Sequence, residues 1–178
     1  MTAAMTNHPA RALRFAPALA CIPRDPAAPG HDWADQWPLR TQLELAALDT
    51  APGCARAHAC AVLREWRADA DLADVAVLIV SELLTNAVAS TQAHGCPDPV
   101  RMWMLGDRRS VLFLIWDATA RAPVRVSATP GDECGRGLAL ADALCARWGF
   151  YHPAGHPGGK VVWALLEPEA IASEQFIP

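Results

Sequence analysis

The sequence predicts an α+β domain in which a sheet has its helices on one face. The chain has 178 residues, of which 52% are apolar and 19% charged, enough for one sizeable core and too few for two ordinary domains. Segments with the two-residue period of strands and the 3.6-residue period of helices follow in the order strand, helix, helix, strand, strand, loop, helix, strand, strand. The long loop before the last helix is of the kind that usually binds or covers a ligand.

The first structured segments are a strand and two helices. Gln42–Ala46 alternates apolar and polar residues, as a half-buried strand does. A helix is expected to begin near Thr50 or Pro52, because apolar residues then recur at helical spacing: Ala55, Ala59, Val62, Leu63 and Trp66. Asp71 is expected to cap a second helix from Leu72 to about Thr91.

A pair of strands follows, Val100–Leu105 and Ser110–Asp117, joined by a short polar turn. The second strand is apolar on both faces, which predicts a central position in the sheet. The segment Ala118–Cys134 has no clear period and is expected to be a loop.

The last elements are a helix and a hairpin. The helix is expected from Leu138 to Trp148, with Gly149 in the left-handed position after its end. Phe150–His152 and Lys160–Glu167 are expected to form the closing hairpin.

The chain ends differ in composition from this domain. Residues 1–39 are rich in proline and alanine without a sustained period, which predicts a flexible extension. The domain is expected to occupy residues 40–168, followed by a short tail, 169–178. Trp33 and Trp37 are the exception in the extension, and we expect them to cover part of the domain's own core.

Composition argues against several classes of protein. The formal net charge of -4 gives no basic excess for a phosphate backbone, so nucleic acid is not expected as a ligand. The apolar runs at Val75–Val80 and Val111–Trp116 are far shorter than the roughly 20 residues of a membrane span. Arg11 and Arg14 precede a stretch ending at Cys21 that resembles a lipoprotein signal, but it is too short and contains proline. The cysteines form no CxxC pair, so reduced thiols and a cytoplasmic location are expected.

One helix face combines a carboxylate with an amide. Glu82 and Asn86 are four residues apart and share a face, which Ala89 and Ala93 extend with little bulk. Such a face could hold Mg²⁺ and position a nucleophile beside a phosphate. The alternative is an ordinary solvated face.

Two further positions suit a ligand. Asp117 ends the most apolar strand, where a buried carboxylate could accept a hydrogen bond from an exocyclic amine such as that of adenine; the alternative is a turn cap. Gly135, Arg136, Gly137 and Leu138 precede a helix, whose free N–H groups form an anion site that Arg136 could strengthen.

Other motifs predict no chemistry. Gly158–Lys160 has neither the glycine spacing nor the following helix of a P-loop and predicts a turn. Cys54, His58 and Cys60 supply too few ligands for a structural zinc. No GxSxG element supports a nucleophilic hydrolase.

Taken in order and at this spacing, the motifs SELLTNAVAST, IWDATARAPV, GRGLALADALCARWG and GKVVWALL resemble those of the GHKL ATPase superfamily. The resemblance is strongest to short ATP-binding regulators of actinomycetes related to anti-sigma-factor serine/threonine kinases. It covers about Thr41 to Glu167. It implies a two-layer α/β sandwich of the GHKL (Bergerat) type, with a mixed, mostly antiparallel sheet.

The resemblance also implies roles for the candidate residues. Asn86 would hold the Mg²⁺ that bridges the ATP phosphates, and Glu82 would be the catalytic general base or water-orienting residue. Asp117 would accept a hydrogen bond from the adenine amine. The loop Ala118–Cys134 would be the ATP lid, with Gly135–Leu138 as its hinge and phosphate contact.

This chain departs from the family pattern at two places. Ala118 and Thr119 stand where a DxGxG box would supply glycine, so the mobility of the lid is in doubt. Val161 follows the final-strand lysine where many relatives have threonine, which would remove a hydroxyl near the adenine pocket. Both changes predict weaker binding.

The function implied is an ATP-dependent serine/threonine kinase that sequesters a sigma factor or similar regulator and phosphorylates an antagonist protein. The alternative is a binding module that responds to nucleotide without transferring phosphate. The resemblance further implies a homodimer through Gln42–Ala46, with ATP and Mg²⁺ as cofactors and neither nucleic acid nor membrane as a direct partner.

Overall fold

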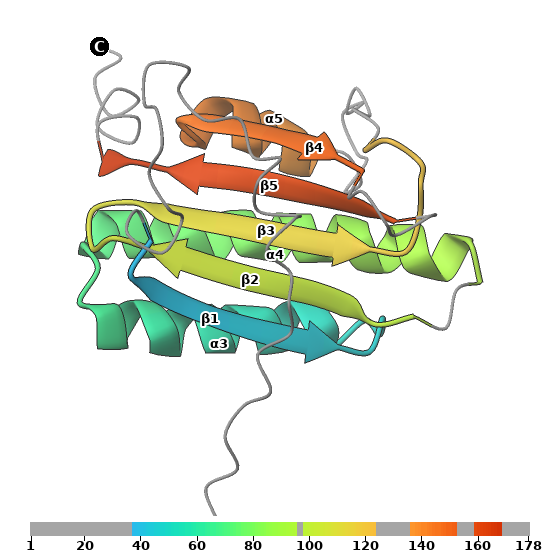
Figure 1. Cartoon of the computed structure of the whole chain (residues 1–178), viewed down its shortest axis with the longest axis horizontal. Coiled ribbons are helices and arrows are strands. Elements are labelled where there is room, and N and C mark those ends of the chain that lie inside the picture. Colours follow the sequence, from blue (N-terminus) through green and yellow to red (C-terminus); the bar gives the residue numbers. More distant parts are fainter. Residues whose placement is uncertain (1–36, 96–97, 124–135, 153–158, 169–178) are drawn as a thin grey trace, which may run out of the picture.

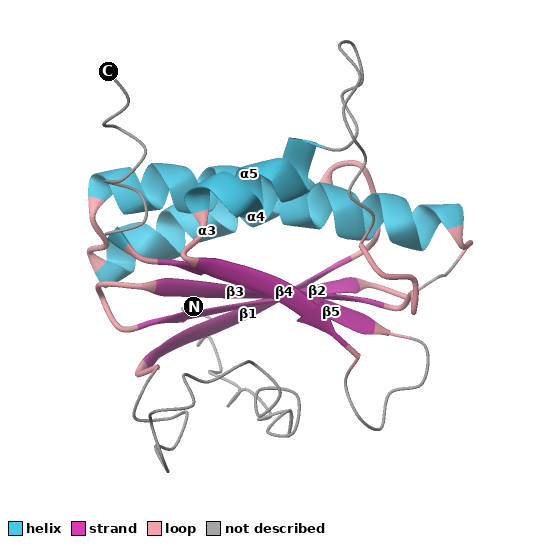
Figure 2. Ribbon diagram, turned by 90° about the horizontal axis from the view of Figure 1, so that it is seen from above, coloured by secondary structure: helices cyan, strands magenta, loops and turns pink. Residues whose placement is uncertain are grey.

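The computed structural model describes residues 37–95, 98–123, 136–152 and 159–168, with the backbone alone at 136–139. The domain has two layers, a sheet and the helices that cover one of its faces, as Figure 2 shows from above. The predicted α+β class is confirmed. The elements of this part of the chain are β1 (Leu39–Leu45), α3 (Ala51–Trp66), α4 (Ala70–Ala93), β2 (Val100–Gly106), β3 (Val111–Asp117), α5 (Arg136–Leu144), β4 (Arg147–Tyr151) and β5 (Lys160–Leu166).

The sheet has the strand order β1-β2-β3-β5-β4, with β3 in the centre as predicted (Figure 1). Each neighbouring pair of these strands is antiparallel, so the expected parallel component is absent from the described residues. The connections explain this. Two successive helices link β1 to β2, and α5 with β4 links β3 to β5, so the chain reverses an odd number of times between neighbours.

The first helix, α3, matches its prediction closely. Pro52 lies in its first turn, where the missing N–H is not needed. Its buried residues follow one stripe, and Trp66 is half-buried at its end. Arg67 ends the helix in the left-handed region, with φ 55°, and its N–H donates to the last carbonyls.

The second helix, α4, begins earlier than predicted, and its cap is Asp69 rather than Asp71. Asp69 has an extended backbone, with ψ 145°, and its carboxylate accepts hydrogen bonds from the N–H groups of Asp71 and Leu72. Asp71 already lies in the first turn. The helix is long and apolar enough to cross a membrane by length and composition alone, but its buried residues belong to the core shared with the sheet.

The predicted third helix was too long. Helix α5 ends at Leu144, and Trp148 and Gly149 lie in β4 instead. Gly149 pairs with Trp163 of β5, and a Cβ at Gly149 would come within 3.1 Å of that indole ring. Close packing against the Trp163 ring therefore favours glycine at this strand position, which is not a helix end.

Apolar side chains fill both faces of the sheet. The larger cluster lies between the sheet and the helices and contains the side chains of Phe113 and Ile115. The second cluster, on the opposite face, includes Leu114, Trp163 and Trp37. Trp37 is 5% exposed, which confirms that it covers part of the core, whereas Trp33 lies outside the described residues.

Candidate functional site

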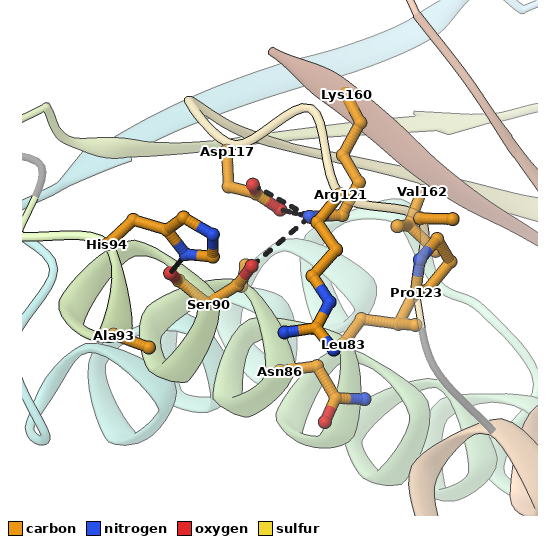
Figure 3. A pocket seen from close by; sticks show the side chains of 12 residues that line it. Leu83, Asn86, Ser90, Ala93, His94, Asp117, Arg121, Pro123, Lys160 and Val162 are labelled. Atoms are coloured by element: carbon orange, nitrogen blue, oxygen red, sulfur yellow. Dashed lines mark hydrogen bonds and ion pairs between the residues drawn. The ribbon is translucent and has the colours of Figure 1, made fainter. Parts of the chain in front are cut away.

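A pocket of about 330 Å³ lies between α4 and the adjoining ends of β3 and β5. Two residues predicted from the sequence, Asn86 and Asp117, are brought together in it from elements far apart in the chain (Figure 3). The lining residues are Leu83, Asn86, Ala87, Ser90, Ala93, His94, Asp117, Arg121, Ala122, Pro123, Lys160 and Val162.

The α4 side of the pocket has polar side chains at its edge and small side chains in its middle. Asn86 is exposed at the mouth, with Ser90 one turn further along. Glu82 lies one turn before Asn86 and is half-buried, but it is not among the lining residues. Ala93 lines the pocket, whereas Ala89 faces a hollow on the α3 side of the helix.

The sheet side of the pocket contains a buried ion pair. Asp117 is 1% exposed and Lys160 is 3% exposed. The Lys160 Nζ atom lies 2.8 Å from Oδ1 of Asp117 and 2.7 Å from Oδ2. An unpaired charge at this depth would be strongly unfavourable, so the burial of each group depends on the opposite charge of the other.

Two hydroxyl groups complete this cluster. The Thr119 hydroxyl donates to Asp117 Oδ1 over 2.6 Å, and the Thr119 backbone N–H donates to the same oxygen over 2.9 Å. Thr119 Oγ1 also accepts from Lys160 Nζ at 2.8 Å and lies 2.8 Å from Ser90 Oγ. These hydrogen bonds connect the end of β3 and the start of β5 to helix α4 at the pocket wall.

Sequence reasoning missed Lys160 and Thr119. Lys160 was expected to begin the closing strand, and it does begin β5, but Gly158–Lys160 was given no role beyond a turn, whereas the Lys160 ammonium group lies in the pocket wall. The available signal was a single lysine, in a chain whose other basic residues are arginines, at the start of an apolar strand. Lysine is almost never fully buried without a partner, so such a position predicts a buried acidic group nearby.

The prediction that Val161 removes a hydroxyl group near the pocket is wrong. Side chains alternate between the two faces of a strand, so Lys160 and Val162 face the pocket while Val161 faces away. Val161 packs in the second apolar cluster with Trp37. A hydroxyl at position 161 would therefore not reach the pocket.

The predicted lid and hinge are only partly within the described residues. Arg121, Ala122 and Pro123, at the start of the loop Ala118–Cys134, line the pocket. Gly135 lies outside the described residues. Arg136, Gly137 and Leu138 form the backbone of the first turn of α5.

A divalent cation would find few protein ligands here. No group of three His, Cys, Asp or Glu side chains is close enough to hold a metal within the described ranges. Cys54 and Cys60 are exposed free thiols, and His58 contacts Thr41 through Nε2 at 3.3 Å. Asn86 could supply one amide oxygen to Mg²⁺, whose other ligands would be waters and substrate phosphates.

Residues 45–165 match the family model of the histidine kinase-like ATPase domain, which is more than half of the chain. The chain belongs to this family. The match spans both sides of the pocket, from α4 to β5. No curated protein matches the chain.

A solved structure supports the fold of this histidine kinase-like ATPase domain. It is the crystal structure of the RsbU and RsbW domains of Rv1364c from Mycobacterium tuberculosis, with a TM-score of 0.55 and 22% sequence identity. The alignment covers 72% of this chain and 32% of that one. At this identity the likeness shows the fold.

Membership of an ATPase family implies a site for ATP, and the pocket fits one. Asp117 Oδ2 is buried and forms an ion pair with Lys160 over 2.7 Å, but it accepts no hydrogen bond of good geometry from the described residues. A ligand amine could donate a well-directed hydrogen bond to this oxygen. Asn86, in contrast to the buried Asp117, is exposed and lies on the solvent side of the pocket.

Proposed function

We propose that this chain is an ATP- and Mg²⁺-dependent serine/threonine protein kinase that switches a regulatory partner. The observation that most favours it is the joining of Asn86 and Asp117 in one pocket of a histidine kinase-like ATPase domain. The resemblance to anti-sigma-factor kinases and the structural likeness to a protein with an RsbW domain favour a sigma factor and its antagonist as partners.

Each candidate residue has a distinct role in this proposal. The Asp117 carboxylate accepts a hydrogen bond from the adenine amine, and Asn86 contributes its amide oxygen to Mg²⁺ at the phosphates. When bound, Mg²⁺ neutralises charge on the phosphate oxygens. Glu82, one turn from Asn86 on the same helix, accepts the proton of the attacking hydroxyl.

The reaction is a phosphoryl transfer. The hydroxyl oxygen of a serine or threonine on the antagonist forms a bond to the γ-phosphorus, and the bond between that phosphorus and the β–γ bridging oxygen breaks. The hydroxyl proton passes to Glu82, and ADP leaves. Catalysis of this kind depends on positioning and charge stabilisation, which is consistent with a site of few groups on rigid elements.

The test is phosphorylation of a captured antagonist. The tagged full chain would be used to isolate its partners from native cells, and the purified partner would be incubated with ATP and Mg²⁺. We expect phosphoserine or phosphothreonine on the partner by mass spectrometry, and its loss in Glu82→Gln with ATP binding retained. Glu65→Gln, an exposed change on α3, is the matched control. A verified partner that stays unphosphorylated would overturn the kinase proposal.

Two observations favour the alternative, a nucleotide-responsive binding module without catalysis. Glu82 is outside the lining of the pocket, and the segment after Asp117 lacks the glycines of the family box. In that case ATP would change partner affinity, while Glu82→Gln would change nothing. Assembly as a homodimer through β1 and a cytoplasmic location remain parts of the proposal.

A further inference from the structure

The face of the sheet that points away from the helices, here called the outer face, is apolar and buried. Helices α3, α4 and α5 all lie on the other face, as Figure 2 shows, and an antiparallel sheet of this kind commonly has its second face in water. Yet Leu112 and Leu114 of the central strand are each 2% exposed. The other apolar residues that the strands contribute to this face are Trp103, Leu105, Trp116, Tyr151, Val161, Trp163 and Leu165.

The described residues supply little that could cover the outer face. Among them, Trp37 is the only member of this apolar cluster that lies outside the strands. The four strands β2, β3, β5 and β4 present a face of roughly 400 Å², from about 4.8 Å between strands and about 3.3 Å per residue. One aromatic side chain has only about 150 to 250 Å² of surface to bury on all its sides. The described residues therefore do not account for the burial of the outer face.

Trp37 also indicates where the rest of the cover comes from. It is the first described residue of the chain, and its side chain is buried against the outer face. Its Nε1–H group is buried without an acceptor among the described residues. A buried indole N–H usually has a hydrogen-bond partner, so a segment that passes over Trp37 would supply the acceptor.

The position and length of each remaining segment favour the N-terminal one. The segments outside the described ranges are 1–36, 96–97, 124–135, 153–158 and 169–178. Residues 96–97 and 153–158 are short connections, and 124–135 lead from β3 to α5 on the helix face. Residues 169–178 are few and follow the end of β5. Residues 1–36 are the longest of these segments and end directly before Trp37, which already lies on the outer face.

We propose that residues 1–36 bind across the outer face of the sheet as an intramolecular strap. The segment contains apolar side chains that suit an aromatic surface: Leu13, Phe15, Leu19, Ile22 and Trp33. Its prolines lack an N–H group, so fewer backbone donors lose water when the segment lies on apolar strands. The strap replaces the expected flexible extension. It lies on the opposite face from the nucleotide pocket, so it does not depend on the proposed function.

The first experiment is photo-crosslinking within the full chain. The photoreactive amino acid p-benzoylphenylalanine replaces Trp103 in one variant and Trp116 in another, because both are half-buried on the outer face. The control replaces Leu78, which is exposed on α4. We expect the two outer-face variants to give a product at the mass of one chain, with the cross-linked peptide inside residues 1–36, and the control to give none to that segment.

Three results of this experiment would overturn the proposal. A cross-link from the outer face to residues 169–178 would assign the cover to the C-terminal segment. A product at twice the chain mass would assign it to a second copy. Absence of any cross-link from folded variants at both Trp103 and Trp116 would show that nothing lies over this face.

The second experiment leaves the sheet unchanged, so it decides even if the outer-face variants fail to fold. The full chain labelled with 5-fluorotryptophan has seven tryptophans for ¹⁹F NMR, and Trp33→Phe identifies the signal of Trp33. We expect this signal to be shifted from its position in the urea-unfolded chain and to lack the solvent isotope shift of an exposed indole. A Trp33 signal at the unfolded position, with the full isotope shift, would overturn the proposal.

Discussion

At the scale of single residues, the buried pair Asp117 and Lys160 shows how chemistry and packing depend on each other. Neither charged group could be buried alone. Together with Thr119 they form a charged part of the pocket wall within apolar surroundings. Asp117 could be predicted from its place at a strand end. For Lys160 the single lysine at the start of an apolar strand indicated a buried acidic partner, but not that the partner is Asp117, which becomes a neighbour only when β3 and β5 pair.

The cap of α4 is the residue-scale feature that gives the simplest stability prediction. Asp69→Ala removes the acceptor for two backbone N–H groups and should lower the free energy of unfolding by about 1 kcal/mol. Asp71→Ala removes only a first-turn charge and should cost about half as much or less. Urea denaturation followed by circular dichroism compares them, and equal effects would show that Asp69 is not the cap.

Cys145 gives a prediction about reactivity. Burial, together with the nearby Asp142 carboxylate, raises the pKa of the Cys145 thiol to about 12. At pH 8 only about one Cys145 thiol in 10,000 would be ionised, and because the thiolate is the reactive form, the reaction should be slow. Iodoacetamide should therefore modify the exposed Cys54 and Cys60 first, with Cys145 following as the pH rises toward 12 or as the chain unfolds. Peptide mass spectrometry measures this, and equal rates at pH 8 would contradict it.

At the scale of elements, the register of β5 corrects the most specific sequence argument. The final-strand motif predicted that Val161 lowers nucleotide affinity, but side chains alternate along a strand, and Val161 lies on the face opposite the pocket. The same scale explains the error at the end of α5. Trp148 and Gly149 continue the helical spacing in sequence, yet both lie in β4, where Gly149 packs closely against the Trp163 ring.

Contact between α3 and the hairpin of β2 and β3 gives a prediction for these elements. A Cβ on Gly106 would lie 2.8 Å from the Trp66 ring, so Gly106→Ala should lower the free energy of unfolding by about 1 to 3 kcal/mol. Gly53→Ala is the matched control in α3, where the nearest atom is 3.7 Å away. There alanine should be neutral or stabilising by up to about 1 kcal/mol. Thermal unfolding of both variants decides, and a harmless Gly106→Ala would show that α3 packs differently.

At the scale of the whole molecule, the sequence was sufficient for the layers and for most elements. Periodicity placed α3, α4, β2 and β3 to within a few residues, and it identified β3 as central. The direction of the strands and the hydroxyl groups behind Asp117 depend on contacts between distant segments, which periodicity does not contain. Asn86 and Asp117 could be selected as candidates because each has a local pattern, a helix face and a strand end, and both line the pocket.

We propose that ATP and Mg²⁺ bind in the pocket between Asn86 and Asp117, and calorimetry measures that binding. Asn86 is exposed, so Asn86→Ala should leave the fold intact, with Thr85→Ala as the control on the same helix. We expect the wild type and Thr85→Ala to bind ATP with Mg²⁺, and Asn86→Ala to bind at least about tenfold more weakly. Absence of binding by the wild type, or equal binding by Asn86→Ala, would contradict the claim.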